Sequence, residues 1–181
     1  MADTNEFTIS LVTPERVLIE GRATEVILRT GEGDAAFLPG HTPLVGTLQP
    51  GVVRVVPAEG EEQRVAVHGG FVQVELGVAA GDDESAPPGS RVTLLVGVAE
   101  LAEEIDVDRA RLALDAAEAR VSELVGAGAR TAGGDEGQEA HPELVEAEAE
   151  LLRAQVRLEA ADATSGPTSG AASGVASAAT A

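Results

Sequence analysis

The chain has 181 residues and a formal net charge of −19, and all of its 12 basic residues are arginine. A chain of this length can bury one core or two small ones. Its acidic balance excludes nucleic acid as a partner, because phosphate binding requires a basic face. The absence of cysteine excludes disulfides, a thiolate nucleophile and a cysteine zinc site. The three histidines are far apart in sequence, so we predict no metal site.

The hydrophobic residues are aliphatic. With three Phe, no Trp and no Tyr, Val, Leu, Ile and Ala must supply the core. The first residues show neither a basic leader nor an apolar stretch. No window approaches the roughly 18 apolar residues of a membrane helix. We therefore expect a cytosolic chain without direct membrane insertion.

Residues 7–98 alternate between apolar and polar side chains. Phe7, Ile9 and Leu11 are separated by polar neighbours, and similar runs recur up to Val96. Period-two alternation is typical of half-buried strands, and we count roughly eight to ten runs between Gly and Pro turns. The pattern predicts an antiparallel β-sandwich over residues 1–98, with a longer loop at 80–89.

The period changes to that of helices after Glu100. Asp106 is a good N-cap, and Pro142 suits the first turn of a second helix. Both helices carry narrow stripes at spacings of three and four residues: Ala110, Leu114, Ala117, Val121 and Leu124, then Leu144, Ala147, Leu151, Ala154, Leu158 and Ala161. Alternate alanines let two helices approach closely, so residues 99–163 are predicted to form an antiparallel hairpin, marginally stable alone. The uncharged tail, 164–181, is interpreted as disordered.

Spacing alone indicates no active site. The loop Thr30–Asp34 lacks the lysine of a phosphate-binding loop, so a tight strand connection explains it better. The His68-Gly69-Gly70 sequence is more typical of a strand end or bulge than of a ligand. The acidic run Asp82–Glu84 is interpreted as a solvated loop, and no Gly-x-Ser-x-Gly elbow occurs.

Five short motifs follow one another along the chain: Val12–Arg16, Gly31–Leu44, Leu48–Val55, Gly69–Val74 and Ile105–Ala110. The second contains Pro-Gly-His-x-Pro-Leu, and the last reads Ile-Asp-x-x-Arg-Ala. This ordered set, spanning residues 7–161, resembles the epsilon subunit of bacterial F-type (rotary) ATP synthases. The loop at 77–90 and the linker at 126–140 are longer than in that family, and the tail after Asp162 is extra.

The resemblance implies a non-catalytic rotor subunit, not an enzyme. Its β-sandwich would bind the gamma subunit and sit on the c-subunit ring within the central stalk, coupling the ring to the catalytic head. Its hairpin would regulate ATP hydrolysis, either folding compactly or extending along gamma toward the alpha and beta subunits. Such a protein is peripheral, on the cytoplasmic face of the cell membrane. It requires no cofactor, although regulatory ATP binds some relatives.

The resemblance also implies two sites. The turn that holds Asp34 and His41 would contact the c ring. A regulatory ATP site would consist of Glu100, Asp106, Arg109, Arg153 and Arg157. Ala116 stands where ATP-binding relatives have a basic residue, which removes one phosphate contact. The alternative is that these arginines pair with acids on solvated faces, Arg153 with Glu150 for instance.

Two other functions remain open from sequence. A carboxylate enzyme on a β-sandwich, such as a glycosidase, is disfavoured because aromatic platforms for sugar stacking are nearly absent. A stand-alone adaptor, whose hairpin binds another helical protein, would have the same β-sandwich and helical hairpin. Co-purification with ATP synthase subunits would separate that adaptor from a rotor subunit.

Overall fold

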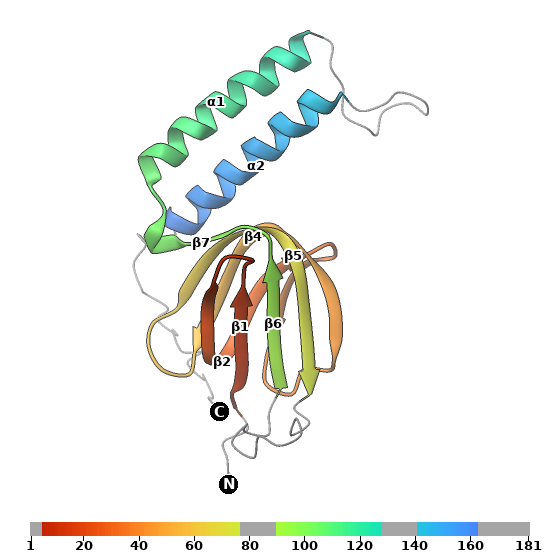
Figure 1. Cartoon of the computed structure of the whole chain (residues 1–181), viewed down its shortest axis with the longest axis vertical. Coiled ribbons are helices and arrows are strands. Elements are labelled where there is room, and N and C mark those ends of the chain that lie inside the picture. The colour runs from red at the N-terminus through yellow and green to blue at the C-terminus, as the bar shows by residue number, and fades with distance from the viewer. Residues whose placement is uncertain (1–4, 77–89, 128–140, 163–181) are drawn as a thin grey trace, which may run out of the picture.

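The computed structural model describes residues 5–76, 90–127 and 141–162 (Figure 1). Its strands are β1 (Phe7–Val12), β2 (Val17–Thr30), β3 (Gly33–Phe37), β4 (Leu44–Pro57), β5 (Gln63–Leu76), β6 (Ser90–Val96) and β7 (Ala99–Leu101). A 3-10 turn, η1 (Ala102–Glu104), leads to α1 (Val107–Gly126) and then α2 (Pro142–Asp162). The predicted loop at 80–89, nearly all of the linker after Gly126 and the tail at 164–181 lie outside the described residues.

The strands form a β-sandwich that closes on itself. Neighbours follow the order β1-β6-β5-β4-β2-β3, and an additional β1–β2 pairing closes the ring. All described pairs are antiparallel except β1 and β6, which run parallel with Ile9 beside Val92. The short β7 pairs with β5, so the sheet continues past the boundary placed at residue 98. Closure removes most free strand edges and stiffens the body.

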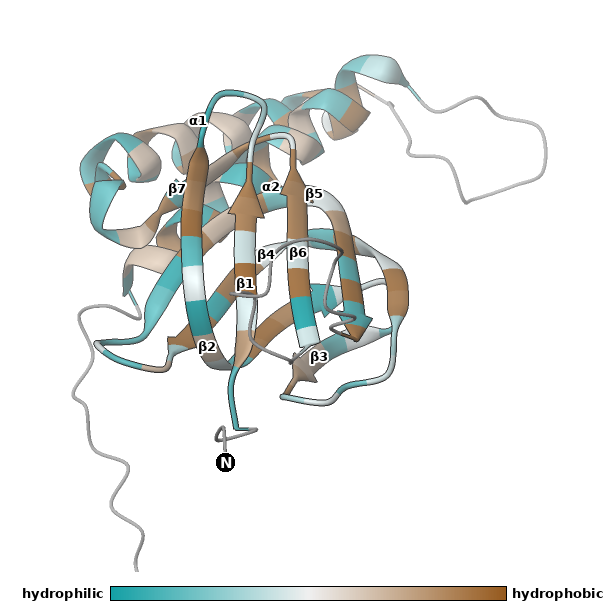
Figure 2. Ribbon diagram, turned by 60° about the horizontal axis from the view of Figure 1, so that its bottom comes forward, coloured by the Kyte–Doolittle hydropathy of each residue, from teal (hydrophilic) through white to brown (hydrophobic). Residues whose placement is uncertain are grey.

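The predicted alternation of side chains builds the core. Phe7, Ile9 and Leu11 are buried on β1 while the residues between them are partly exposed. Figure 2 shows the same alternation of hydrophobic and hydrophilic residues along the strands. The described residues contain seven strands, fewer than the eight to ten runs expected. β4 and β5, of 14 residues each, contain more than one run because they bend and continue.

One bend lies at Gly69 and Gly70, where β5 passes from pairing with β7 to pairing with β6. Both glycines have positive φ, +99° and +153°. A Cβ on Gly70 would lie 2.3 Å from the carbonyl oxygen of Leu95. Backbone conformation and close approach therefore both require glycine here.

The two helices lie side by side and antiparallel, projecting from one end of the sandwich (Figure 1). Asp106 is the N-cap of α1, and its side chain accepts a hydrogen bond from the backbone N–H of Arg109. The most buried stripe positions are Ala110, Ala117, Leu144, Ala147 and Ala154. The predicted cap, the start at Pro142 and the alanine-rich contact are all present in the structure.

The end of α2 has a second buried face. Val156 and Ala160, which are not part of the predicted stripe, are 3% and 0% exposed. They belong to a cluster that also contains Ala66 of β5 and Ile105 of the connection after η1. This cluster docks the hairpin on the sandwich.

Candidate functional site

The candidate site is the interface between the last turns of α2 and the outer surface of β4, β5 and β7. Ala66 and His68 alternate on β5 with the core residues Val65 and Val67, so they point out of the sandwich. Ala66 packs in the cluster that contains Val156 and Ala160. His68 lies two residues further along the same face of the strand.

Three of the predicted ATP-site residues meet here. Arg153, Val156, Arg157 and Ala160 follow one another at helical spacing, so they share the face of α2 that meets the sheet. Arg157 donates two hydrogen bonds to Oε1 of Glu100 on β7, one of them from Nε at 3.0 Å. Both side chains are about one-third exposed. The pair therefore ties α2 to the sheet beside the apolar cluster.

His68 lies among these charges. Burial is the main reason that its pKa is lowered from the ordinary value. The positive charge of Arg157 lowers this pKa further, Glu100 raises it, and Arg153 lowers it. Neither ring nitrogen has a hydrogen-bond partner among the described residues. The sequence interpretation of His68-Gly69-Gly70 as a strand end or bulge agrees with the bend at the two glycines, but it missed the position of His68 under α2.

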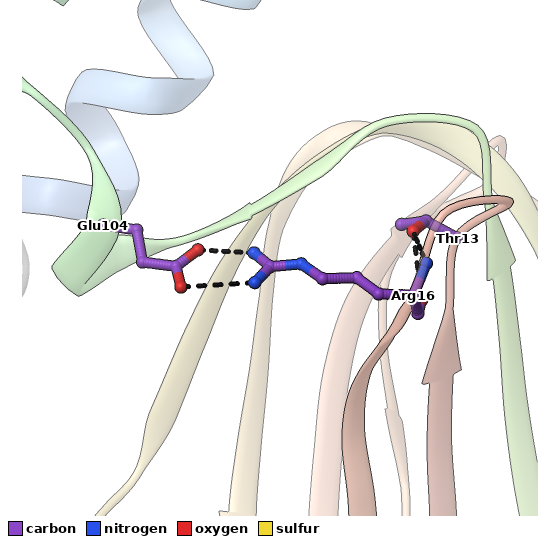
Figure 3. A network of polar contacts seen from close by, with 3 residues as sticks. All are labelled: Thr13, Arg16 and Glu104. Atoms are coloured by element: carbon purple, nitrogen blue, oxygen red, sulfur yellow. Dashed lines mark hydrogen bonds and ion pairs between the residues drawn. The ribbon is translucent and has the colours of Figure 1, made fainter.

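A second ion pair holds the start of the hairpin. Nη2 of Arg16 lies 2.5 Å from Oε2 of Glu104, and Nη1 lies 3.4 Å from Oε1 (Figure 3). Arg16 is positioned by the turn between β1 and β2, where the hydroxyl of Thr13 donates to the Arg16 carbonyl and accepts from its N–H. Because Glu104 belongs to η1, the contact fixes the connection from the sandwich to α1.

The other predicted ATP ligands lie at the start of α1. Asp106 is engaged as the N-cap, and Arg109 is exposed in the first turn. No contact described in the structure joins Asp106 or Arg109 to the group formed by Glu100, Arg153 and Arg157. The alternative pairing of Arg153 with Glu150 is not among the ion pairs of the described residues.

The two predicted c-ring residues lie toward opposite ends of β3. Asp34, near its start, accepts a hydrogen bond of 2.8 Å from Nε of Arg29, and this contact lowers the pKa of the Asp34 carboxyl. His41 follows the strand, with its ring 4.7 Å from that of Phe37 in an edge-on arrangement. About 3.3 Å per strand residue puts Asp34 roughly 10 Å from Phe37 at the end of β3. Asp34 and His41 therefore do not share one turn, although the sequence predicted that they would, because a strand separates them.

An exposed apolar patch lies on the outer face of β4, β5 and β6. Phe71 of β5 is 56% exposed and lies directly opposite Leu95 of β6, which is 49% exposed. Val45 of β4 is 73% exposed and pairs with Gln73, the next outward residue after Phe71. The sequence places these residues in strands, but it does not show that their side chains become neighbours on one surface.

Two other kinds of site were sought in the described residues. They contain no group of three or more His, Asp or Glu side chains arranged to hold a metal ion. None of the described helices is long and apolar enough to span a membrane.

The β-sandwich followed by two antiparallel helices corresponds to one class of ATP synthase subunits, which two family models describe. Residues 6–79 match the model "ATP synthase, Delta/Epsilon chain, beta-sandwich domain". Residues 103–162 match "ATP synthase, Delta/Epsilon chain, long alpha-helix domain". An ATP synthase epsilon chain of Moorella thermoacetica is 39% identical over 155 residues, covering 86% of this chain and 96% of the relative. One from Thermobifida fusca is 48% identical over 120 residues, 65% of this chain and 79% of the relative. The chain belongs to the epsilon subunit family of F-type ATP synthases.

Solved structures share the fold. A chain of the Euglena gracilis mitochondrial ATP synthase, in a structure of its OSCP/F1/c-ring, matches with a TM-score of 0.61 at 23% identity. That match covers 87% of this chain and 81% of the other. A chain of the Tetrahymena thermophila mitochondrial ATP synthase central stalk and c-ring matches with a TM-score of 0.51 at 12% identity, covering 86% and 96%. The predicted sandwich-and-hairpin fold is confirmed.

Proposed function

We propose that this chain is a non-catalytic rotor subunit, which couples the c ring to the catalytic head through gamma and regulates ATP hydrolysis with its hairpin. The observation that carries this proposal is the contrast between a closed sandwich and a hairpin held by a small interface. The closed sandwich suits transmission of torque, since it is stiff. The hairpin suits regulation, since few contacts need to break for it to leave. A peripheral position on the cytoplasmic face of the membrane follows from this role.

The patch of Val45, Phe71 and Leu95 is our candidate for the gamma-binding face. Adjacent exposed apolar side chains on a sheet mark protein interfaces. A Phe71→Ser variant should fold normally, because this side chain is already largely solvated, yet co-purify poorly with gamma. Val98→Ser is the matched control, since Val98 is 52% exposed outside the patch. Equal recovery of gamma with both variants would place the interface elsewhere.

The end of the sandwich near His41 is our candidate for the c-ring contact, together with Asp34 as the family resemblance implies. The structure gives each a local role as well: Asp34 pairs with Arg29, and His41 packs on Phe37. Charge reversal at Asp34 would therefore act both on Arg29 and on a partner, and the experiment must separate the two.

The hairpin is the proposed inhibitory element. Deleting the chain from Asp106 onward should raise ATP hydrolysis by the assembled enzyme and leave assembly intact. The sandwich retains its own core in this variant, because the residues that form or pack against this core end at Leu101, before the deleted segment. Unchanged hydrolysis by an assembled, truncated enzyme would show that this hairpin does not inhibit.

The proposed regulatory ATP site centres on Arg153 and Arg157, with Glu100, Asp106 and Arg109 as further ligands. Guanidinium groups are suited to triphosphate oxygens because they donate paired hydrogen bonds. ATP must compete with Glu100 for Arg157, which would weaken its binding. Calorimetric titration of the isolated subunit with ATP tests the site, with Arg153→Ala compared against Arg120→Ala on the exposed surface of α1. No heat from the wild type at millimolar ATP would refute it.

A further inference from the structure

His68 is an ionisable group that β5 presents to the underside of α2. Its neighbour on the same face, Ala66, packs in one cluster with Val156 and Ala160 of α2. Its partner across the ladder on β4 is Pro50, which carries no charge. The imidazole therefore lies inside the interface that holds the hairpin on the sandwich.

The surroundings of His68 suit a neutral ring better than a cation. Both ring nitrogens are buried and have no hydrogen-bond partner among the described residues. A neutral imidazole leaves one N–H and one lone pair unsatisfied, whereas the cation would bury two donors and a charge.

The charges around the ring also oppose its protonation. Arg153 and Arg157 approach from α2, and Glu100 approaches from β7. Glu100 is already hydrogen-bonded twice by Arg157, so its negative charge is partly compensated. A protonated His68 would leave three cationic side chains around one carboxylate.

We propose that His68 is a protonation-dependent release switch for the helical hairpin: α2 stays docked while the imidazole is neutral, and protonation drives α2 off the sheet. Release gives the imidazolium water as a hydrogen-bond partner and separates it from Arg153 and Arg157. The switch acts on docking within the chain itself, so it does not depend on what the released hairpin inhibits.

The direction of the pH dependence follows from linkage. His68 has a lowered pKa in the docked state, so this state binds the proton more weakly than the released state, in which the pKa of His68 has its ordinary value of about 6.5. Docking is therefore strongest, and independent of His68, above that ordinary value. As the pH falls toward the docked-state pKa, the docking constant decreases by up to about tenfold per pH unit. Carboxylates in model peptides titrate at about pH 4, which lies below the window from pH 8 to 5.5.

Distance measurements on the full chain test the switch. The chain has no cysteine, so spin labels can be attached selectively to introduced cysteines. The substitutions Gln155→Cys on α2 and Gln63→Cys on β5 are suitable, because both glutamines are exposed. In the absence of nucleotide, we expect one docked distance at pH 8 and a growing longer-distance population at pH 5.5. His68→Gln should abolish this response, because glutamine is polar but cannot be protonated. His41→Gln and His141→Gln are the matched controls and should keep it.

A histidine NMR titration of the unlabelled wild type provides a second measurement. It remains informative if His68→Gln fails to dock at any pH. The proposal requires His68 to titrate below pH 6.5 in the docked chain. Three results would each overturn the proposal. The first is a wild-type distance distribution that does not change from pH 8 to 5.5. The others are a His68→Gln chain that responds like the wild type, and a His68 that titrates at or above pH 6.5. Both experiments use the chain without any other ATP synthase subunit, so a negative result would not bear on the proposed rotor role.

Discussion

Replacing Val156 by alanine tests whether the second face of α2 docks the hairpin. Val156 is 3% exposed and belongs to the cluster with Ala66 and Ile105. The substitution removes two buried methyl groups, worth about 0.8 kcal/mol each, before any term for the cavity that remains. Alanine is the better helix former by up to about 0.6 kcal/mol, which offsets part of the loss. Packing wins, and we expect a net destabilisation of about 1–2 kcal/mol.

Leu152→Ala is the matched control on the same helix. Leu152→Ala removes more apolar atoms than Val156→Ala does. Because Leu152 is 41% exposed, however, few of these atoms are packed in an interface. Its effect should stay within about 0.5 kcal/mol. Comparing the two variants separates docking on the sandwich from a general effect of shortening a side chain of α2.

Urea unfolding followed by far-ultraviolet circular dichroism provides the measurement. The chain has no Trp and no Tyr, so intrinsic fluorescence reports little, whereas the signal at 222 nm follows α1 and α2 directly. We expect the midpoint of the helical transition to fall for Val156→Ala and to stay near the wild type for Leu152→Ala. Equal midpoints for the two variants would refute the docking of α2 through Val156.

Three other predictions concern single contacts. A double-mutant cycle of Arg157→Gln and Glu100→Gln should give a coupling free energy of about 1 kcal/mol, because the pair is only partly exposed. This coupling should decrease with salt. A coupling near zero would show that the pair does not help to dock α2. Gly70→Ala should destabilise the sandwich by about 3 kcal/mol or more, because its Cβ would clash with the backbone at Leu95. Gly21→Ala is the control, since no atom lies within 4 Å of its Cβ. In thermal unfolding, the midpoint should fall for Gly70→Ala and change little for Gly21→Ala. Asp34→Lys should weaken coupled proton pumping by the assembled enzyme more than Arg29→Gln does. Both variants break the same ion pair, but only Asp34→Lys reverses the charge at the proposed c-ring contact. Equal pumping by the two variants would argue against that contact.

The sequence predicts well those features that depend on local periodicity. The burial of Phe7, Ile9 and Leu11 follows from alternation on one strand, and the stripe from Ala110 to Leu124 follows from helical spacing. Asp106 and Pro142 mark where the two helices begin, because Asp106 can cap a helix and Pro142 fits a first helical turn. Each of these predictions depends on residues within one element.

Features that depend on two distant elements are not visible in the sequence. Nothing in β1 or β6 indicates that they pair in parallel, because alternation is the same in either direction. The second face of α2 has helical spacing, from Arg153 to Ala160, but two arginines within it suggest a solvated surface. Only the fold shows that Glu100 of β7 and His68 of β5 lie beneath those arginines.

The composition of the two apolar clusters supports the proposal that the hairpin, rather than the sandwich, responds to a small chemical change. The core of the sandwich contains mostly Val, Leu, Ile and Phe. By contrast, four of the six buried members of the docking cluster are alanine, which contribute little burial each. Docking therefore depends heavily on Val156, Ile105 and the ion pairs of Arg157 and Arg16, so its total free energy is small. The proposed protonation of His68, or phosphate binding at the proposed ATP site around Arg153, would change the docking free energy by a comparable amount. Neither event reaches the closed core, so the proposed release of the hairpin would leave the sandwich intact for its proposed role in the rotor.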